Sequence, residues 1–332
     1  MYTNDDLNGA VEQGIFTQDS VETFRDYISE QKETKTVDEE NFKLLTGFND
    51  IFVVIASILL LSSAGWIASA VGSRFSAGVV ALIAWGLSEF FVGKRKMPLP
   101  AIVLLLVFVA SIFKLFYIEP TYSSIEETGS IFAFAMAGVA TIFHWKRFAV
   151  PITIAIGMGV VTLFLISSFI DMFPDSKEYI AFVIFLIGIG VFLVAMYWDM
   201  QDRKRVSNHS HVAFWLHLLA SPLIIHSLFL GLGVFDNNIG SFALFSILFA
   251  YVLLSIISLT IERRALMVSS LLYVLYALKT LFTEYGFEGY GLSLGGVIIG
   301  LGLLFLTAFW TKARATVVGY MPSFIQLKVP VV

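Results

Sequence analysis

The fold is decided by the segment Ile51–Ala70, which reads IFVVIASILLLSSAGWIASA and contains no charged residue. A helix needs about 20 predominantly apolar residues to cross the hydrocarbon core of a bilayer, so this segment predicts a membrane span. Backbone groups inside a bilayer must hydrogen bond internally, which favours α-helices. Similar segments recur along the chain, and we predict ten spans, at residues 51–70, 76–92, 99–118, 130–144, 149–169, 179–197, 212–230, 241–260, 266–282 and 292–310.

The composition of the chain agrees with a membrane protein. Apolar residues make up 58% of the sequence and charged residues 14%, compared with about 45–50% and about 25% in soluble domains. The absence of cysteine excludes a disulfide framework, thiolate chemistry and a cysteine metal site. The predicted fold class is all-α: a polytopic transmembrane helical bundle of about ten spans with a small N-terminal cytoplasmic helical segment.

Charge separates the chain into regions with different surroundings. Residues 1–50 hold twelve acidic and four basic side chains, a net charge of −8, whereas the remainder carries +4. Within the acidic part, Val21, Phe24 and Ile28 have the spacing of one helix face. We therefore predict an acidic cytoplasmic helical head and linker at residues 1–48, a transmembrane domain of ten helices at residues 49–314, and a cytoplasmic C-terminal tail at residues 315–332.

Basic residues are concentrated in every second predicted loop, and the intervening loops are acidic or neutral. The positive-inside rule places basic loops in the cytoplasm. We therefore expect both termini there, and the protein in the inner membrane of a bacterium. The basic positions behind this prediction are Lys94, Arg95, Lys96, Lys146, Arg147, Arg203, Lys204, Arg205, Arg263, Arg264, Lys312 and Arg314.

The seventh predicted span is the most polar, and it contains His217, Ser221, Pro222 and His226. Ionisable residues inside a membrane are costly and are therefore candidates for function, while Pro222 removes a backbone hydrogen bond and favours a kink. Both histidines are expected to face the bundle interior. Two interpretations stay open: they form interhelical hydrogen bonds, or they line a path for a substrate or a proton. They lack metal-ligand spacing and have no acidic residue nearby in the sequence, so no metal site is predicted.

Three further charged residues lie near the ends of predicted spans. Lys114 and Lys279 lie near the outer ends of the third and ninth spans. Their ammonium groups are expected either to extend to the membrane interface or to face an outward vestibule. Glu89, near the inner end of the second span, is expected to neutralise Lys94 or to reach the interface; a role as a proton carrier is the alternative.

The chain contains a weak internal repeat. Residues 55–63 match residues 219–227 at an offset of 164, and the first span thus corresponds to the seventh. An even number of spans separates the matched segments, so the repeat would be parallel, unlike the inverted repeats of many transporters. Chance similarity between apolar segments is the alternative. At an offset of 165 the matched pairs are Lys114 with Lys279, Glu119 with Glu284, and Trp145 with Trp310.

Three segments carry a resemblance to a known family. They are Leu7–Ile28, Ser62-Ser63-Ala64-Gly65-Trp66 at the end of the first span, and Ser88-Glu89-Phe90-Phe91 before Lys94-Arg95-Lys96. In these segments the chain resembles a domain-of-unknown-function family of uncharacterised bacterial polytopic membrane proteins with a short N-terminal soluble helical segment. The resemblance covers roughly the first third of the chain. It implies a similar architecture but no particular activity.

We expect the chain to be surrounded by the lipid bilayer. Two classes of function are then possible. The first is a transporter or permease-like protein with a path beside the seventh span. The second is a non-catalytic envelope scaffold whose acidic head, residues 1–42, binds a cytoplasmic protein. An enzyme is less favoured because the sequence shows no paired catalytic groups, and we predict no cofactor. None of the glycine-rich segments follows a predicted strand, so they do not predict a nucleotide-binding loop. The short basic loops do not predict nucleic-acid binding.

Overall fold

The computed structural model describes residues 4–24, 48–117, 126–203, 205, 207–232, 241–284 and 289–330. The chain divides into two compact units, Met1–Lys43 and Leu44–Val332. In the first unit, α1 (Asn4–Glu12) is followed by a turn and by helical residues 18–24. Val21 is buried there, whereas Ile28 lies outside the described residues. The predicted binding of a cytoplasmic partner by this unit stays a prediction.

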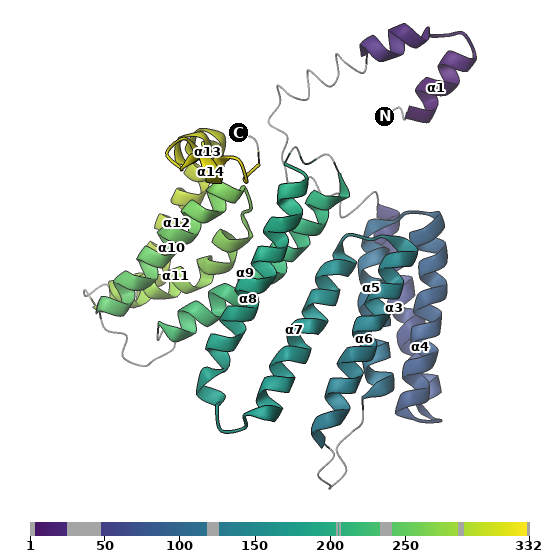
Figure 1. Cartoon of the computed structure of the whole chain (residues 1–332), viewed down its shortest axis with the longest axis horizontal. Coiled ribbons are helices and arrows are strands. Elements are labelled where there is room, and N and C mark those ends of the chain that lie inside the picture. Colours follow the sequence, from purple (N-terminus) through teal and green to yellow (C-terminus); the bar gives the residue numbers. More distant parts are fainter. Residues whose placement is uncertain are drawn as a thin grey trace. The chain divides into compact units, whose positions relative to one another are not determined.

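The second unit is built from helices that follow the predicted spans (Figure 1). No strand occurs in the part of the chain that the structure describes, so the all-α prediction is confirmed. A helix occupies each of the ten predicted positions: α3 (Phe48–Ser69), α4 (Ser73–Ser88), α5 (Pro98–Phe116), α6 (Glu126–Phe148), α7 (Ile152–Met172), α8 (Ile180–Gln201), α9 (Asn208–Gly231), α10 (Ser241–Ile261), α11 (Ala265–Glu284) and α12 (Gly291–Ala308).

Six or seven of the described helices have the length and apolar character of a membrane span. Within the described ranges, six helices are long and apolar enough to cross a membrane: α3, α4 with its π-helical continuation η1 (Glu89–Lys94), α5, α7, α8 and α9. The bent pair Ser293–Ala308 and Trp310–Gly319 makes seven if it counts as one span. Six or seven such helices support a membrane location, while the count of ten stays a prediction.

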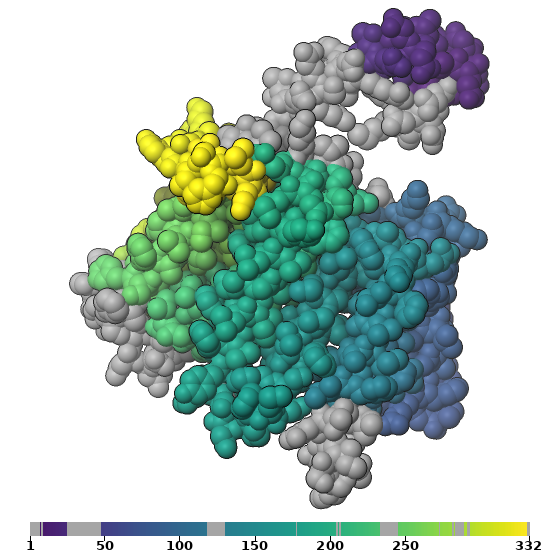
Figure 2. Space-filling view, in the orientation of Figure 1, coloured from purple at the N-terminus to yellow at the C-terminus, as the bar shows by residue number. Residues whose placement is uncertain are grey.

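The C-terminal part contains two helices that the sequence analysis did not predict. The chain bends by 79° after α12 and continues as α13 (Trp310–Gly319) and the short α14 (Ser323–Gln326). α13 contacts both α10 and α12, and Figure 2 shows α13 and α14, in yellow, as a compact group over one end of these helices. Residues 310–330 therefore form part of the second unit.

The distribution of side chains is that of a protein surrounded by lipid. Large apolar residues are exposed on the outside, including Leu82 at 76%, Phe249 at 70% and Leu304 at 70%. Small residues such as Ala84 and Ala195 are fully buried between helices. Extensive exposed apolar surface marks contact with a membrane or another protein, and small residues allow membrane helices to approach closely.

Two groups of helices pack in a similar way. α5 contacts α3, α4 and α6, and α11 contacts α9, α10 and α12. These partners correspond one to one under the predicted repeat, in which α3 matches α9. α3 also packs against α4, whereas α9 and α10 share no comparable contact among the described residues, so the parallel repeat stays a prediction.

The turns after η1, α6, α8 and α10 share one backbone feature. Each contains a residue other than glycine with a positive φ angle, at Lys96, Ala149, Arg205 and Glu262. Such a left-handed residue after a helix lets the chain reverse within a few positions and satisfies carbonyls of the last turn. These are the four predicted basic loops, so the helices that they join are held as tight antiparallel pairs at this basic end of the unit.

Candidate functional site: buried charges at the junction of α8, α9 and the α10–α11 turn

The predicted site residue His217 lies on the third turn of α9 and is 1% exposed. Its Nε2 atom lies 2.9 Å from Oδ2 of Asp199, on the last turn of α8. Asp199 is likewise 1% exposed. Because an ionised carboxylate only accepts hydrogen bonds, this geometry requires Nε2 to carry a proton and to donate it to Asp199.

Arg263, in the turn between α10 and α11, completes the cluster. Its Nη2 donates to Oδ1 of Asp199 at 2.6 Å, and its Nε donates to Oδ2 at 3.3 Å. The two donors give a bidentate guanidinium–carboxylate pair, the strongest form of this contact. Nη2 also donates to the backbone carbonyl of Ser210 at 3.0 Å. The aspartate and arginine charges cancel, so the junction buries three ionisable side chains without net charge when His217 is neutral.

The helices that carry Asp199 and His217 approach closely one to two turns further along α9. A Cβ atom on Gly188 of α8 would lie 2.9 Å from Cγ1 of Ile224, 3.0 Å from its backbone nitrogen, and 3.0 Å from Cβ of Leu223. Only glycine therefore permits the observed separation of the helices. Pro222 lies in this region of α9, and the helix continues through it without a break. Ser221 donates to the carbonyl of His217 at 2.6 Å.

The other predicted site residues do not join this cluster. The expectation that His226 faces the interior is wrong: it is exposed, and its Nδ1 lies 2.7 Å from the Tyr273 hydroxyl. Lys114 and Lys279 are exposed near the far ends of α5 and α11. Lys279 lies roughly 21 Å along α11 from its first residue, which follows the Arg263 turn closely. The lysines and His217 are therefore not one site.

A second group of charges lies in the same end of the molecule. Glu262, beside Arg263, is 3.2 Å from Nη2 of Arg314 and 3.8 Å from Nη1 of Arg205. The side chains of all three are less than a tenth exposed. Arg205 also donates to the carbonyls of Ile261 and Glu262, at 3.1 and 3.3 Å. The α8–α9 turn, the α10–α11 turn and α13 are thus joined by buried ion pairs.

Two arginines also hold the C-terminal segment by its backbone. Arg203 donates to the carbonyls of Val329 and Gln326, at 2.9 and 3.1 Å. Arg314 donates to the carbonyl of Pro330 at 2.7 Å. The segment is recognised through main-chain oxygens, so its contacts depend on the backbone path after α14 more than on side-chain identity.

Glu89 is paired with a different residue from the one expected. The sequence analysis named Lys94 as its partner, whereas the structure gives Arg147 at the end of α6, with contacts of 2.9 Å from Nε and 2.6 Å from Nη2. Both residues lie at the surface. Lys94 is the nearer cation in the sequence, but the fold places Arg147 of α6 beside Glu89 of η1.

The sequence analysis missed Asp199 and did not assign Arg263 to a site. Asp199 is the one acidic residue in the apolar segment 179–201, and this is the signal that could have identified it. Among the described residues, no group of three His, Cys, Asp or Glu side chains could hold a metal ion. Comparisons with models of protein families, with curated proteins and with solved structures found no match.

Proposed function

We propose that this chain is a permease-like protein of the bacterial inner membrane with a solute path beside α9, closed at the basic end by Asp199, His217 and Arg263. The observation that supports this proposal is the complete burial of three ionisable side chains where α8, α9 and the α10–α11 turn meet. Ionisable residues inside membrane segments are rare and costly, and they mark solute, ion and proton paths.

Burying these charges costs free energy. Replacing a buried ion pair with well-packed apolar residues is often neutral or stabilising, so stability alone gives little reason to retain one here. A closure made of charges has a different property: when it opens, water hydrates the separated groups and offsets part of the lost attraction. An apolar contact gains nothing from water in this way. The cluster is thus suited to a junction that opens and closes.

Ser221 provides a test, since it follows His217 by one turn on α9 and is fully buried. We expect a cysteine at Ser221 to react with a small, charged, water-soluble thiol reagent in membrane vesicles, because the path opens to water. The chain has no native cysteine, so labelling has no background. The rate is measured by mass spectrometry of the intact protein.

The matched control for this test is Ala220, which is equally buried but packs in the apolar cluster with Val191 and Ala195 of α8. A cysteine at Ala220 is expected to stay unreactive under the same conditions. Equal protection of both cysteines would mean that the junction stays closed, and would contradict the permease proposal.

The orientation of the protein is also proposed on the loop charges. We expect reporter fusions after residues 96, 147 and 264 to be active in the cytoplasm, and a fusion after residue 174 to be active outside, because the basic turns stay inside. A reporter pair with opposite compartment requirements, such as a phosphatase and a fluorescent protein, measures this. A cytoplasmic signal at residue 174 would reverse the proposed orientation of α7 and α8.

A further inference from the structure

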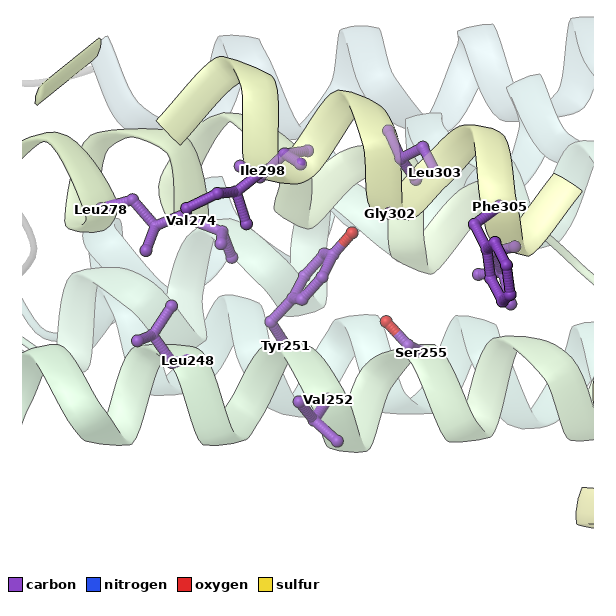
Figure 3. Close-up of a pocket in the computed structure, with 12 residues that line it drawn as sticks. Leu248, Tyr251, Val252, Ser255, Val274, Leu278, Ile298, Gly302, Leu303 and Phe305 are labelled. Carbon is purple, nitrogen blue, oxygen red and sulfur yellow. The ribbon is translucent and has the colours of Figure 1, made fainter. Parts of the chain in front are cut away.

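A pocket of about 470 Å³ lies between α10, α11 and α12 (Figure 3). Its volume falls within the range of roughly 300–1,000 Å³ typical of small-molecule sites, which are also mainly apolar. None of its lining residues belongs to the cluster of Asp199, His217 and Arg263. Its walls include Leu248 and Tyr251 of α10, Val274 and Leu278 of α11, and Ile299 and Leu303 of α12.

The pocket has few polar groups. Tyr251 and Ser255 supply the only polar side chains among its lining residues. Figure 3 shows both on α10, with the Tyr251 ring reaching towards α12. A guest without hydrogen-bonding groups is therefore matched to the pocket, whereas a polar guest would lose its hydration without compensation.

The opening of the pocket is lined by residues that face the outside of the helix bundle. Val252 is 55% exposed, Ile298 is 53% exposed and Phe305 is 68% exposed. In a chain that spans a membrane, such an apolar outer surface contacts the hydrocarbon of the bilayer. The molecules with access to this opening are therefore lipid chains and other solutes dissolved among them.

The matching region of the first helix group is packed differently. Leu278 and Ile299 correspond, at the repeat offset of 165, to Phe113 and Phe134. The rings of these two phenylalanines pack against each other with centroids 4.6 Å apart, across the interface of α5 and α6. Leu278 and Ile299 are smaller than these phenylalanines, but Tyr251, Ile298, Leu303 and Phe305 of the pocket are larger than their matched residues Gly86, Ala133, Gly138 and Ala140.

At one further position of the pocket the side chain is also smaller than the matched one. Gly302 corresponds to Ala137, which is fully buried in the first group. A Cβ atom on Gly302 would meet no heavy atom within 4 Å, so the pocket extends to its backbone.

We propose that the pocket between α10, α11 and α12 binds one acyl chain of a bilayer lipid. The apolar walls and the opening towards hydrocarbon both fit an alkyl chain that enters sideways from the membrane. This binding does not depend on a solute path beside α9, because the residues that carry it belong to other helices.

The test uses the full chain in lipid nanodiscs that contain a phospholipid with a photoreactive diazirine midway along one acyl chain. We expect adducts on Tyr251 and Ser255, mapped by mass spectrometry of peptides. Leu253, exposed on another side of α10, reports the ordinary contact of the helix with lipid. Adducts at Leu253 but not at Tyr251 or Ser255 would overturn the proposal.

Two variants separate pocket binding from general lipid contact. Leu278→Phe with Ile299→Phe places two larger side chains in the pocket, and Gly302→Leu fills it from a second position on α12. Both are expected to lose the adducts on Tyr251 and Ser255 and to keep those at Leu253; thermal unfolding verifies that at least one variant is folded. Adducts that persist in a folded variant, or crosslinks between two copies of the chain through this surface, would contradict acyl-chain binding.

Discussion

Replacing Asp199 with asparagine is expected to lower the free energy of unfolding by about 3–5 kcal/mol, the typical cost of removing one partner from a buried ion pair. Asparagine keeps the size of the side chain and its ability to accept a hydrogen bond from His217. It removes the negative charge, however, and leaves the guanidinium of Arg263 buried without compensation. Thermal unfolding in detergent, followed by circular dichroism, measures the loss.

The structure offers two controls for this expectation. Glu89→Gln also neutralises an acid paired with an arginine, but this pair lies at the surface, where solvent screens it, so only a small effect is expected. Adding Arg263→Met to Asp199→Asn removes the uncompensated charge, and part of the lost stability should return. A double variant no more stable than Asp199→Asn alone would mean that the buried charge is not the cause.

The second large loss of stability is expected from a substitution of Gly188, at the contact between α8 and α9. Gly188→Ala is expected to cost about 1–3 kcal/mol, as inserting a methyl group into a close-packed interior does. The new Cβ would lie within 3.0 Å of three atoms of Leu223 and Ile224, one of them a backbone nitrogen. Rotation of a side chain cannot move a backbone nitrogen, so the two helices must separate. The shift in the unfolding temperature measures the cost.

Gly190 is the matched control, on the same helix and two residues further along. A Cβ atom there meets nothing within 4 Å. Gly190→Ala is therefore expected to be neutral or to stabilise by up to about 1 kcal/mol, since alanine favours the helix over glycine. Equal destabilisation by both substitutions would show that helix contact at Gly188 is not what limits the spacing of α8 and α9.

The two predictions address different components of the same junction. Asp199 reports on charge compensation between helices that the chain brings together from distant positions, and Gly188 reports on the separation of two of those helices. Because both residues lie on α8, a movement of α8 against α9 would alter the two contacts together. This connection is what makes the junction a suitable element for the opening that the permease proposal requires.

The sequence by itself determined the membrane character of the protein, its helical class and the positions of its helices. These properties are local: an uninterrupted apolar segment of sufficient length predicts a helix in lipid without reference to any other segment. The sequence also identified His217, because an ionisable residue inside an apolar span is conspicuous wherever the span lies.

The partners of His217 were decided by the tertiary structure alone. Asp199 precedes it by 18 residues, and Arg263 is 64 residues from Asp199. α8 is apolar on all sides, so its sequence does not indicate which face is turned towards α9. Rotation of a helix about its axis is fixed by close packing, as at Gly188 and Ile224. Only that packing brings a carboxylate, an imidazole and a guanidinium from three segments into contact.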